Sequence, residues 1–261
     1  MEQPKSTLSR PSRAPGIVLL VAVIAGAGAL GWWLRSRQPP PPPGAPAAAP
    51  APSAAAPDAG PDAPPPSPAD QRALVEAMSG NALFRRWVGE GDLLRRWVVV
   101  TDNLAEGVSP RAQLGALAPE RPFSVLEQGG ETVIAPAAYH RYDDVGDVVA
   151  SLDAAAAARC YRALHGMLAA GYRALGYPGA DLDAVTARAL RRLADAPAKD
   201  GPIAVRKEEG AYVFADERLE ALGPVEKHLL RMGPRNARIV QAKARELLVA
   251  LGMSASGNAP R

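Results

Sequence analysis

Along most of the chain beyond residue 68, apolar side chains recur every three or four positions, which is the spacing of amphipathic helices. The strongest such pattern runs from 151 to 176 and leaves only a narrow polar line, so we expect this helix at the centre of the fold. A second helix is expected from 182 to about 195, with Asp181 as its N-cap. The apolar face of the longer helix comprises Ala156, Cys160, Ala163, Leu164, Met167 and Gly171.

Shorter helical segments are predicted nearer the N-terminus. Ser67 followed by Pro68 is typical of a helix start, and this helix should end near Ser79. Two similar segments follow, "LFRRWV" at 83 to 88 and "LLRRWV" at 93 to 98, each with a Trp on its apolar face. We expect the arginines of both segments to lie over the Trp rings or to pair with acids.

Two other stretches alternate apolar and polar residues around a turn, which is the pattern of a β-hairpin. The first is "FSVLEQGGETVIAP", turning at Gly129-Gly130, and the second is "PIAVRKEEGAYVFAD", turning at Glu209-Gly210. The pattern leaves open whether the hairpins join in one sheet or lie apart. The predicted fold class is therefore a mostly α domain with one or two β-hairpins.

The last predicted helices lie in a basic stretch, with Gly223-Pro224 and Gly233-Pro234 each ending one helix and starting the next. Residues 224 to 251 hold six cations and two acids. We expect Arg231 and Arg235 to meet acids from other elements, and the remaining basic face to be solvated or to meet an acidic partner. The apolar side of the last helix comprises Asn236, Val240, Ala244, Leu247 and Leu251.

The N-terminal part differs in kind from the rest. Residues 16 to 34 form nineteen uncharged positions, enough to span the hydrocarbon layer of a bilayer, with Trp32 and Trp33 where an interfacial belt would lie. The slight excess of cations before this segment favours a cytoplasmic N-terminus. The expected organisation is a tail (1–15), a transmembrane helix (16–34), a disordered Pro/Ala-rich linker (35–68), a globular domain (69–252) and a disordered tail (253–261).

The basic pI of the chain does not indicate a nucleic-acid-binding domain. From residue 69 onward the net charge is only +1, whereas such domains usually carry a clear basic excess. A single cysteine, Cys160, excludes an intramolecular disulfide within this sequence. The three histidines lie far apart, so we expect no metal site and no cofactor, and we expect His165 to be a hydrogen-bonded core residue.

The densest group of candidate functional side chains is "YHRYDDVGD", from Tyr139 to Asp147. Its carboxylates suit general acid/base chemistry or a divalent cation. The competing interpretation is structural, with Asp143 at a turn and Arg141 paired with a neighbour. Asp102 and Asn103 are likewise expected to satisfy backbone groups at a helix end. The sequence shows no nucleophile elbow and no phosphate-binding loop.

Four stretches together resemble a bacterial family known as domain of unknown function 3014: "RRWVVVTDNLAEG", "YHRYDDVGDVVASLD", "YRALGYP" and "LLRMGPRNARIVQAKARELL". The resemblance covers about residues 70 to 251. It implies an anchored bacterial protein with a membrane-tethered helical domain, and it brings no catalytic residue. Where the family pattern has Pro, this chain has Gly166, which would remove a kink from the central helix.

Two hypotheses for the function follow from these observations. The preferred one is a non-enzymatic interaction domain on the periplasmic side of the inner membrane, anchored in the bilayer by residues 16–34, with a protein or cell-wall partner. The alternative is a hydrolase or small-ligand binder with a cleft near Tyr139–Asp147. The candidate ligand or partner surface comprises Tyr139, Arg141, Tyr142, Asp143, Arg231, Arg235 and Asn236.

Overall fold

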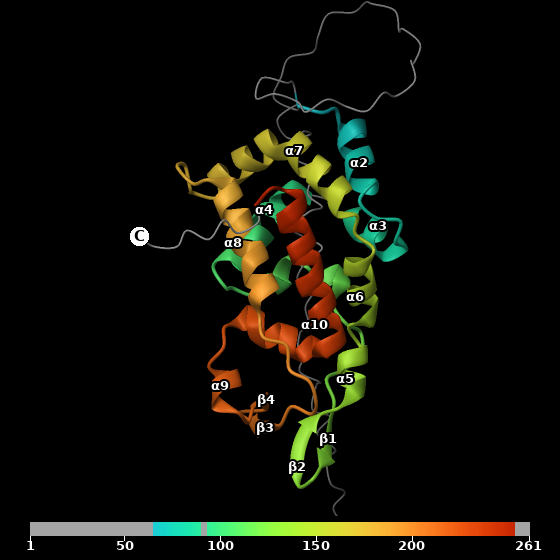
Figure 1. Cartoon of the computed structure of the whole chain (residues 1–261), viewed down its shortest axis with the longest axis vertical. Helices are drawn as coiled ribbons and strands as arrows, with labels where there is room; N and C mark the ends of the chain where they lie inside the picture. The colour runs from blue at the N-terminus through green and yellow to red at the C-terminus, as the bar shows by residue number, and fades with distance from the viewer. Residues whose placement is uncertain (1–64, 90–92, 254–261) are drawn as a thin grey trace, which may run out of the picture.

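A computed structural model describes residues 65–89 and 93–253 of the chain (Figure 1). The predicted N-terminal tail and transmembrane helix, and nearly all of the predicted linker and C-terminal tail, lie outside these residues. Within the described ranges, no helix has the length and apolar character needed to cross a membrane.

The described part of the chain is mostly helical and carries two antiparallel hairpins, as the sequence pattern predicts. The helices are α2 (Pro68–Glu76), α3 (Ala82–Val88), α4 (Leu93–Ala105), α5 (Pro136–His140), α6 (Asp143–Ala150), α7 (Ala154–Ala174), α8 (Leu182–Asp195), α9 (Glu217–Glu220) and α10 (Pro224–Ala250). Two short 3-10 turns, η2 (Arg111–Gln113) and η3 (Gly115–Leu117), lie between α4 and the first hairpin. The strands are β1 (Val125–Gln128), β2 (Glu131–Ile134), β3 (Val205–Glu208) and β4 (Ala211–Phe214).

Short polar side chains set the start of several helices. Ser67 accepts a hydrogen bond from the Asp70 N–H at the start of α2, and Asp181 accepts from two N–H groups at the start of α8. Both caps confirm the prediction. The long helix α7 begins after Asp153, whose carboxylate accepts from the Ala156 N–H at 2.6 Å, so this helix starts three residues later than its hydrophobic pattern.

The two hairpins lie together at one end of the domain, while α7 crosses the opposite end (Figure 1). Val125 pairs with Ile134 in the first hairpin, and Val205 with Phe214 in the second. They meet where the Ile134 N–H donates to the Ile203 carbonyl at 3.0 Å, next to an isolated bridge between Val133 and Ala204. The two small sheets are thus joined at a single point.

The hydrophobic core is divided in two. The larger cluster lies among α2, α3, α4, α6, α7, α8 and α10 and includes the fully buried Trp87, Trp97 and Tyr142. Arg96 covers the Trp87 ring at 5.1 Å and donates to the Trp87 carbonyl at 3.2 Å, which confirms the prediction for that arginine. The smaller cluster fills the space under the hairpins and comprises Ile134, Ala138, Ile203, Val205, Phe214 and Leu230.

Helix α10 runs between α6 and α8 and packs against α5, α6, α7 and α8 (Figure 1). Its path breaks at Gly233, where φ is +82°, immediately before Pro234. The break confirms that Gly233-Pro234 separates two helical segments, which together carry the label α10. Beyond the break, the predicted apolar side is buried at Asn236, Val240 and Ala244.

Candidate functional site

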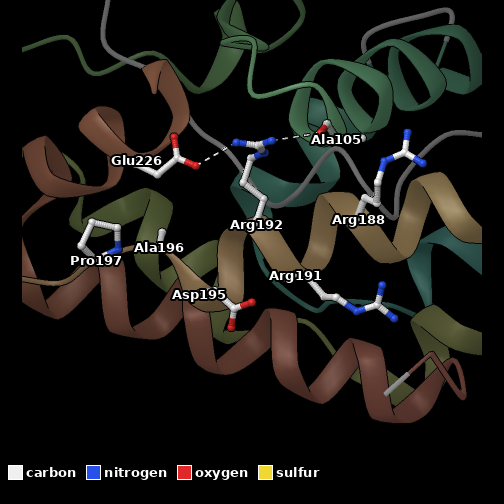
Figure 2. A pocket seen from close by; sticks show the side chains of 8 residues that line it. All are labelled: Ala105, Arg188, Arg191, Arg192, Asp195, Ala196, Pro197 and Glu226. Atoms are coloured by element: carbon white, nitrogen blue, oxygen red, sulfur yellow. Dashed lines mark hydrogen bonds and ion pairs between the residues drawn. The ribbon is translucent and has the colours of Figure 1, made fainter. Parts of the chain in front are cut away.

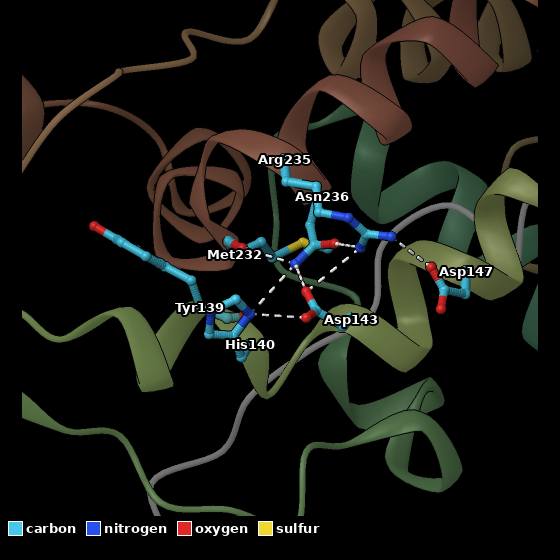
Figure 3. Close-up of polar contacts among 7 residues, drawn as sticks. All are labelled: Tyr139, His140, Asp143, Asp147, Met232, Arg235 and Asn236. Atoms are coloured by element: carbon cyan, nitrogen blue, oxygen red, sulfur yellow. Dashed lines mark hydrogen bonds and ion pairs between the residues drawn. The ribbon is translucent and has the colours of Figure 1, made fainter.

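Three polar side chains of the Tyr139–Asp147 stretch, those of His140, Asp143 and Asp147, gather beside Arg235 and Asn236 of α10 (Figure 3). Asp143, the first residue of α6, accepts a hydrogen bond from Asn236 Nδ2 at 3.0 Å and lies 2.9 Å from His140 Nδ1. Arg235 reaches Asp143 at 3.4 Å and Asp147 at 2.8 Å. We name these five residues, His140, Asp143, Asp147, Arg235 and Asn236, the α6–α10 latch.

Two glycines leave the space that the tight packing at the latch needs. A Cβ atom added at Gly146 would lie 2.3 Å from Asn236 Oδ1, and one at Gly233 would lie 2.6 Å from the Tyr139 ring. Because neither distance is possible between real atoms, both positions require glycine for this packing. Asn236 is 1% exposed, and its Nδ2 also faces the carbonyl oxygens of Met232 at 3.1 Å and Tyr139 at 3.4 Å.

The latch changes the electrostatics of Asp143. Partial burial alone would raise the pKa of this carboxyl group, but the hydrogen bonds from Asn236 and His140 and the charge of Arg235 outweigh burial and lower the pKa. Asp143 is therefore a stabilised carboxylate that accepts hydrogen bonds from three side chains. Its lowered pKa is the opposite of what a general acid needs.

These contacts favour the structural interpretation of the stretch. Asp143 and Asp147 both pair with Arg235, so they do not face one another across a cleft where they could share a proton or an ion. Among the described residues, no group of three metal-ligating side chains comes together. The prediction that Arg235 meets acids from another element is confirmed, whereas Asp143 begins a helix instead of capping a turn.

The other candidate residues of the sequence lie on the hairpin side of the latch. Tyr142 is fully buried with its ring edge-on to His228, and Arg141 donates to the Tyr142 hydroxyl at 3.0 Å. The Arg141 guanidinium lies 4.8 Å from the Tyr142 ring centre and 5.4 Å from that of Phe123. The expected pairing of Arg141 with a neighbour is therefore confirmed, and that neighbour is Tyr142.

Arg231 has a similar environment. Its guanidinium lies 4.5 Å from the centre of the Phe214 ring and donates to the Tyr212 carbonyl at 3.2 Å. Burial lowers the pKa of Arg231 below its ordinary value, and the positive charge of Arg141 adds to that effect, against the opposing influence of Glu220 and Tyr142. The prediction that Arg231 pairs with an acid is wrong, because the nearby Glu220 binds Lys227 at 2.6 Å instead.

A family model described as a protein of unknown function, DUF3014, matches residues 93–248. The chain belongs to the DUF3014 family. No curated protein and no solved structure matches the chain significantly. The DUF3014 match contains the whole latch and both of the arginines that lie on aromatic rings, so these features belong to the part of the chain that defines the family.

A further polar contact joins two distant stretches inside the DUF3014 match. The Tyr172 hydroxyl donates to Asp102 at 2.8 Å, and the ring of Tyr177 stacks on that of Tyr172 at 5.2 Å. Asp102 therefore binds a tyrosine of α7, where the sequence had suggested a backbone group. Sequence reasoning missed this contact, although both partners lie in stretches that carry the family resemblance.

An open pocket of about 330 Å³ lies beside α8 (Figure 2). Arg192 crosses its wall, donating to Glu226 at 3.0 Å and to the Ala105 carbonyl at 3.3 Å, and it passes so close to Gly107 that a Cβ there would lie 2.8 Å away. Arg188 pairs with Glu106 at 3.1 Å, and Arg191 donates to the Met253 carbonyl. The arginines of this pocket thus join α4, α8 and α10 to one another.

His165 does not lie in the core as predicted. Its side chain is 43% exposed and lies 3.2 Å from Asp183, whose carboxylate also accepts from the Tyr161 hydroxyl. The helix carrying His165 is apolar over most of its surface, which led to the prediction, but next to α8 Tyr161 is buried while His165 remains partly exposed. Cys160, in contrast, is 1% exposed and faces the core as predicted.

Proposed function

We propose that this DUF3014 protein is a single-pass membrane protein of the bacterial envelope, with a non-enzymatic interaction domain that faces the periplasm. The anchor, the Pro/Ala-rich spacer and the orientation rest on the sequence alone. A tethered domain behind a long spacer suits a partner that lies away from the membrane.

One observation carries the non-enzymatic part of the proposal. Polar residues of the family stretches bind one another across α4, α6, α7 and α10, at Asp143 with Asn236 and at Asp102 with Tyr172. A catalytic site needs at least some of these groups to converge on a place where a substrate can bind. Here these polar groups hold the helices in position, so the outer surface of the domain is the part that would recognise a partner.

Photo-crosslinking in intact cells tests this function. A photoreactive residue placed at Leu126 or at Tyr177 samples the hairpin end and the opposite end of the domain, since these side chains are 38% and 44% exposed. We expect a reproducible crosslinked partner from at least one of the two positions. The absence of any partner, together with turnover of a substrate by the purified protein, would replace this function with the hydrolase alternative.

A further inference from the structure

Arg141 and Arg231 form one continuous group with three aromatic residues. Arg141 lies on Phe123, the Phe123 ring lies 5.7 Å from that of Tyr212, and Arg231 donates to the Tyr212 carbonyl. Phe214, under the guanidinium of Arg231, completes the set. These residues come from α5–α6, α10, β4 and the segment before β1, so the group exists only in the folded domain.

The two guanidinium groups have most of their hydrogen-bonding capacity unused. Each carries five N–H donors in a planar fork, yet Arg141 and Arg231 make one direct hydrogen bond each to the described residues. Arg141 Nε is buried without a partner, and so is the nearby Tyr139 hydroxyl. Arg192 and Arg235, by comparison, both reach carboxylates of this domain.

The local charge is also unbalanced. Glu220 is the acid whose charge acts most on Arg231. However, it already pairs with the Lys227 ammonium and accepts a hydrogen bond from the Phe214 N–H at 2.8 Å. A half-buried cation in apolar surroundings is costly unless an anion pairs with it. This region therefore presents positive charge on aromatic rings, and no described carboxylate forms an ion pair with either guanidinium.

We propose that Arg141 and Arg231 bind a carboxylate in an acidic peptide segment of the partner, an inference that rests on the proposed interaction function. A planar guanidinium fork matches a carboxylate with two parallel hydrogen bonds, and the partly exposed rings of Phe123 and Tyr212 offer apolar contact to the neighbouring peptide. A membrane surface fits less well, because it is recognised by a broad cluster of four or more cations on a polar face.

The test uses the full chain in detergent micelles and a fluorescent peptide of Glu and Ala residues. A peptide with Gln in place of Glu is the uncharged control, and binding is followed by fluorescence anisotropy at fixed salt. We expect the Glu peptide to bind and the Gln peptide to fail. Arg141→Met and Arg231→Met should each weaken binding by at least about tenfold, because each removes a charge-assisted pair.

Two further variants separate recognition from folding. Arg238 lies in α10, as Arg231 does, but it already pairs with Asp200. Arg238→Met should therefore change peptide binding by less than about twofold. Arg141→Lys keeps the charge but loses the fork, so it should bind more weakly than the wild type and more tightly than Arg141→Met. Thermal unfolding of each variant identifies any loss of binding that comes from unfolding.

Several results would overturn the inference. Equal binding of the Glu and Gln peptides, or unchanged binding by both Met variants, removes the carboxylate site. Inorganic phosphate that competes with an affinity equal to that of the Glu peptide would assign the site to another anion. Binding to vesicles of anionic lipid with that affinity, lost in the arginine variants, would do the same. A crosslinked partner that is captured equally by wild type and Arg141→Met leaves the interaction function intact and removes only this site.

Discussion

At the scale of single residues, Gly233 in α10 and Gly166 in α7 are two helix glycines in opposite surroundings. Gly233 has a positive φ and no room for a Cβ, whereas Gly166 lies exposed in α7 with nothing within 4 Å of an added Cβ. We expect Gly233→Ala to lower the free energy of unfolding by about 3 kcal/mol, through backbone strain and the clash with Tyr139. Gly166→Ala should raise it by about 0.5–1 kcal/mol. Urea denaturation measures both, and equal effects would contradict the described geometry.

Cys160 gives a second residue-scale prediction. Burial raises the pKa of its thiol to about 12, and the side chain is 1% exposed, so neither the thiolate nor access to it is available in the folded state. We expect an aromatic disulfide reagent to leave the native protein unmodified at pH 8 and to react at once in denaturant. Rapid reaction under native conditions would show that α7 opens locally.

At the scale of elements, the contact of α6 with α10 can be measured by a double-mutant cycle. Gly146→Ala pushes a methyl group against Asn236 Oδ1, and Asn236→Ala removes both the obstacle and a donor to Asp143. We expect the double variant to be more stable than the sum of the single effects predicts, by about 1 kcal/mol or more. Gly166→Ala combined with Asn236→Ala is the control, and it should be additive within about 0.5 kcal/mol.

The same contact predicts a pH dependence. Because the folded pKa of Asp143 is lower than its unfolded value, its contribution to stability is full above the unfolded pKa of about 4 and is lost as the pH falls through the folded pKa. Asp143→Asn should therefore cost stability at pH 7 and make the protein less sensitive to acid below pH 4. Urea midpoints across this range measure it, and parallel curves for variant and wild type would contradict the role of Asp143.

The elements themselves are readable from sequence, while their contacts are not. The longer helices and both hairpins follow from local spacing, from caps such as Asp181 and from turns such as Glu209-Gly210, whereas the sequence pattern does not predict the short helices α5, α6 and α9. The latch and the Asp102–Tyr172 bond join residues about 70 or more positions apart, and no local pattern selects such partners. The mistaken interpretation of Arg231 has the same cause, since charge alone predicts an acidic partner but does not show that the nearby Glu220 is already bound by Lys227.

At the scale of the whole molecule, the orientation in the membrane can be tested directly. Reporter enzymes fused after residue 261, one active only in the cytoplasm and one only outside it, distinguish the two arrangements. We expect activity only from the external reporter, because the cations before residue 16 outnumber those just after residue 34. Exclusive activity of the cytoplasmic reporter would place the domain inside the cell and remove the periplasmic part of the proposed function.

The position of α10 in the chain has a consequence for truncated products. This helix packs against α5, α6, α7 and α8, yet it follows all of them in the chain. A polypeptide that stops before residue 224 would leave the apolar faces of those helices without the side chains of Val240, Ala244 and Leu247. Such a fragment would be an aggregating species and a substrate for proteases, not a smaller folded domain, so premature termination anywhere before α10 is equivalent to loss of the protein.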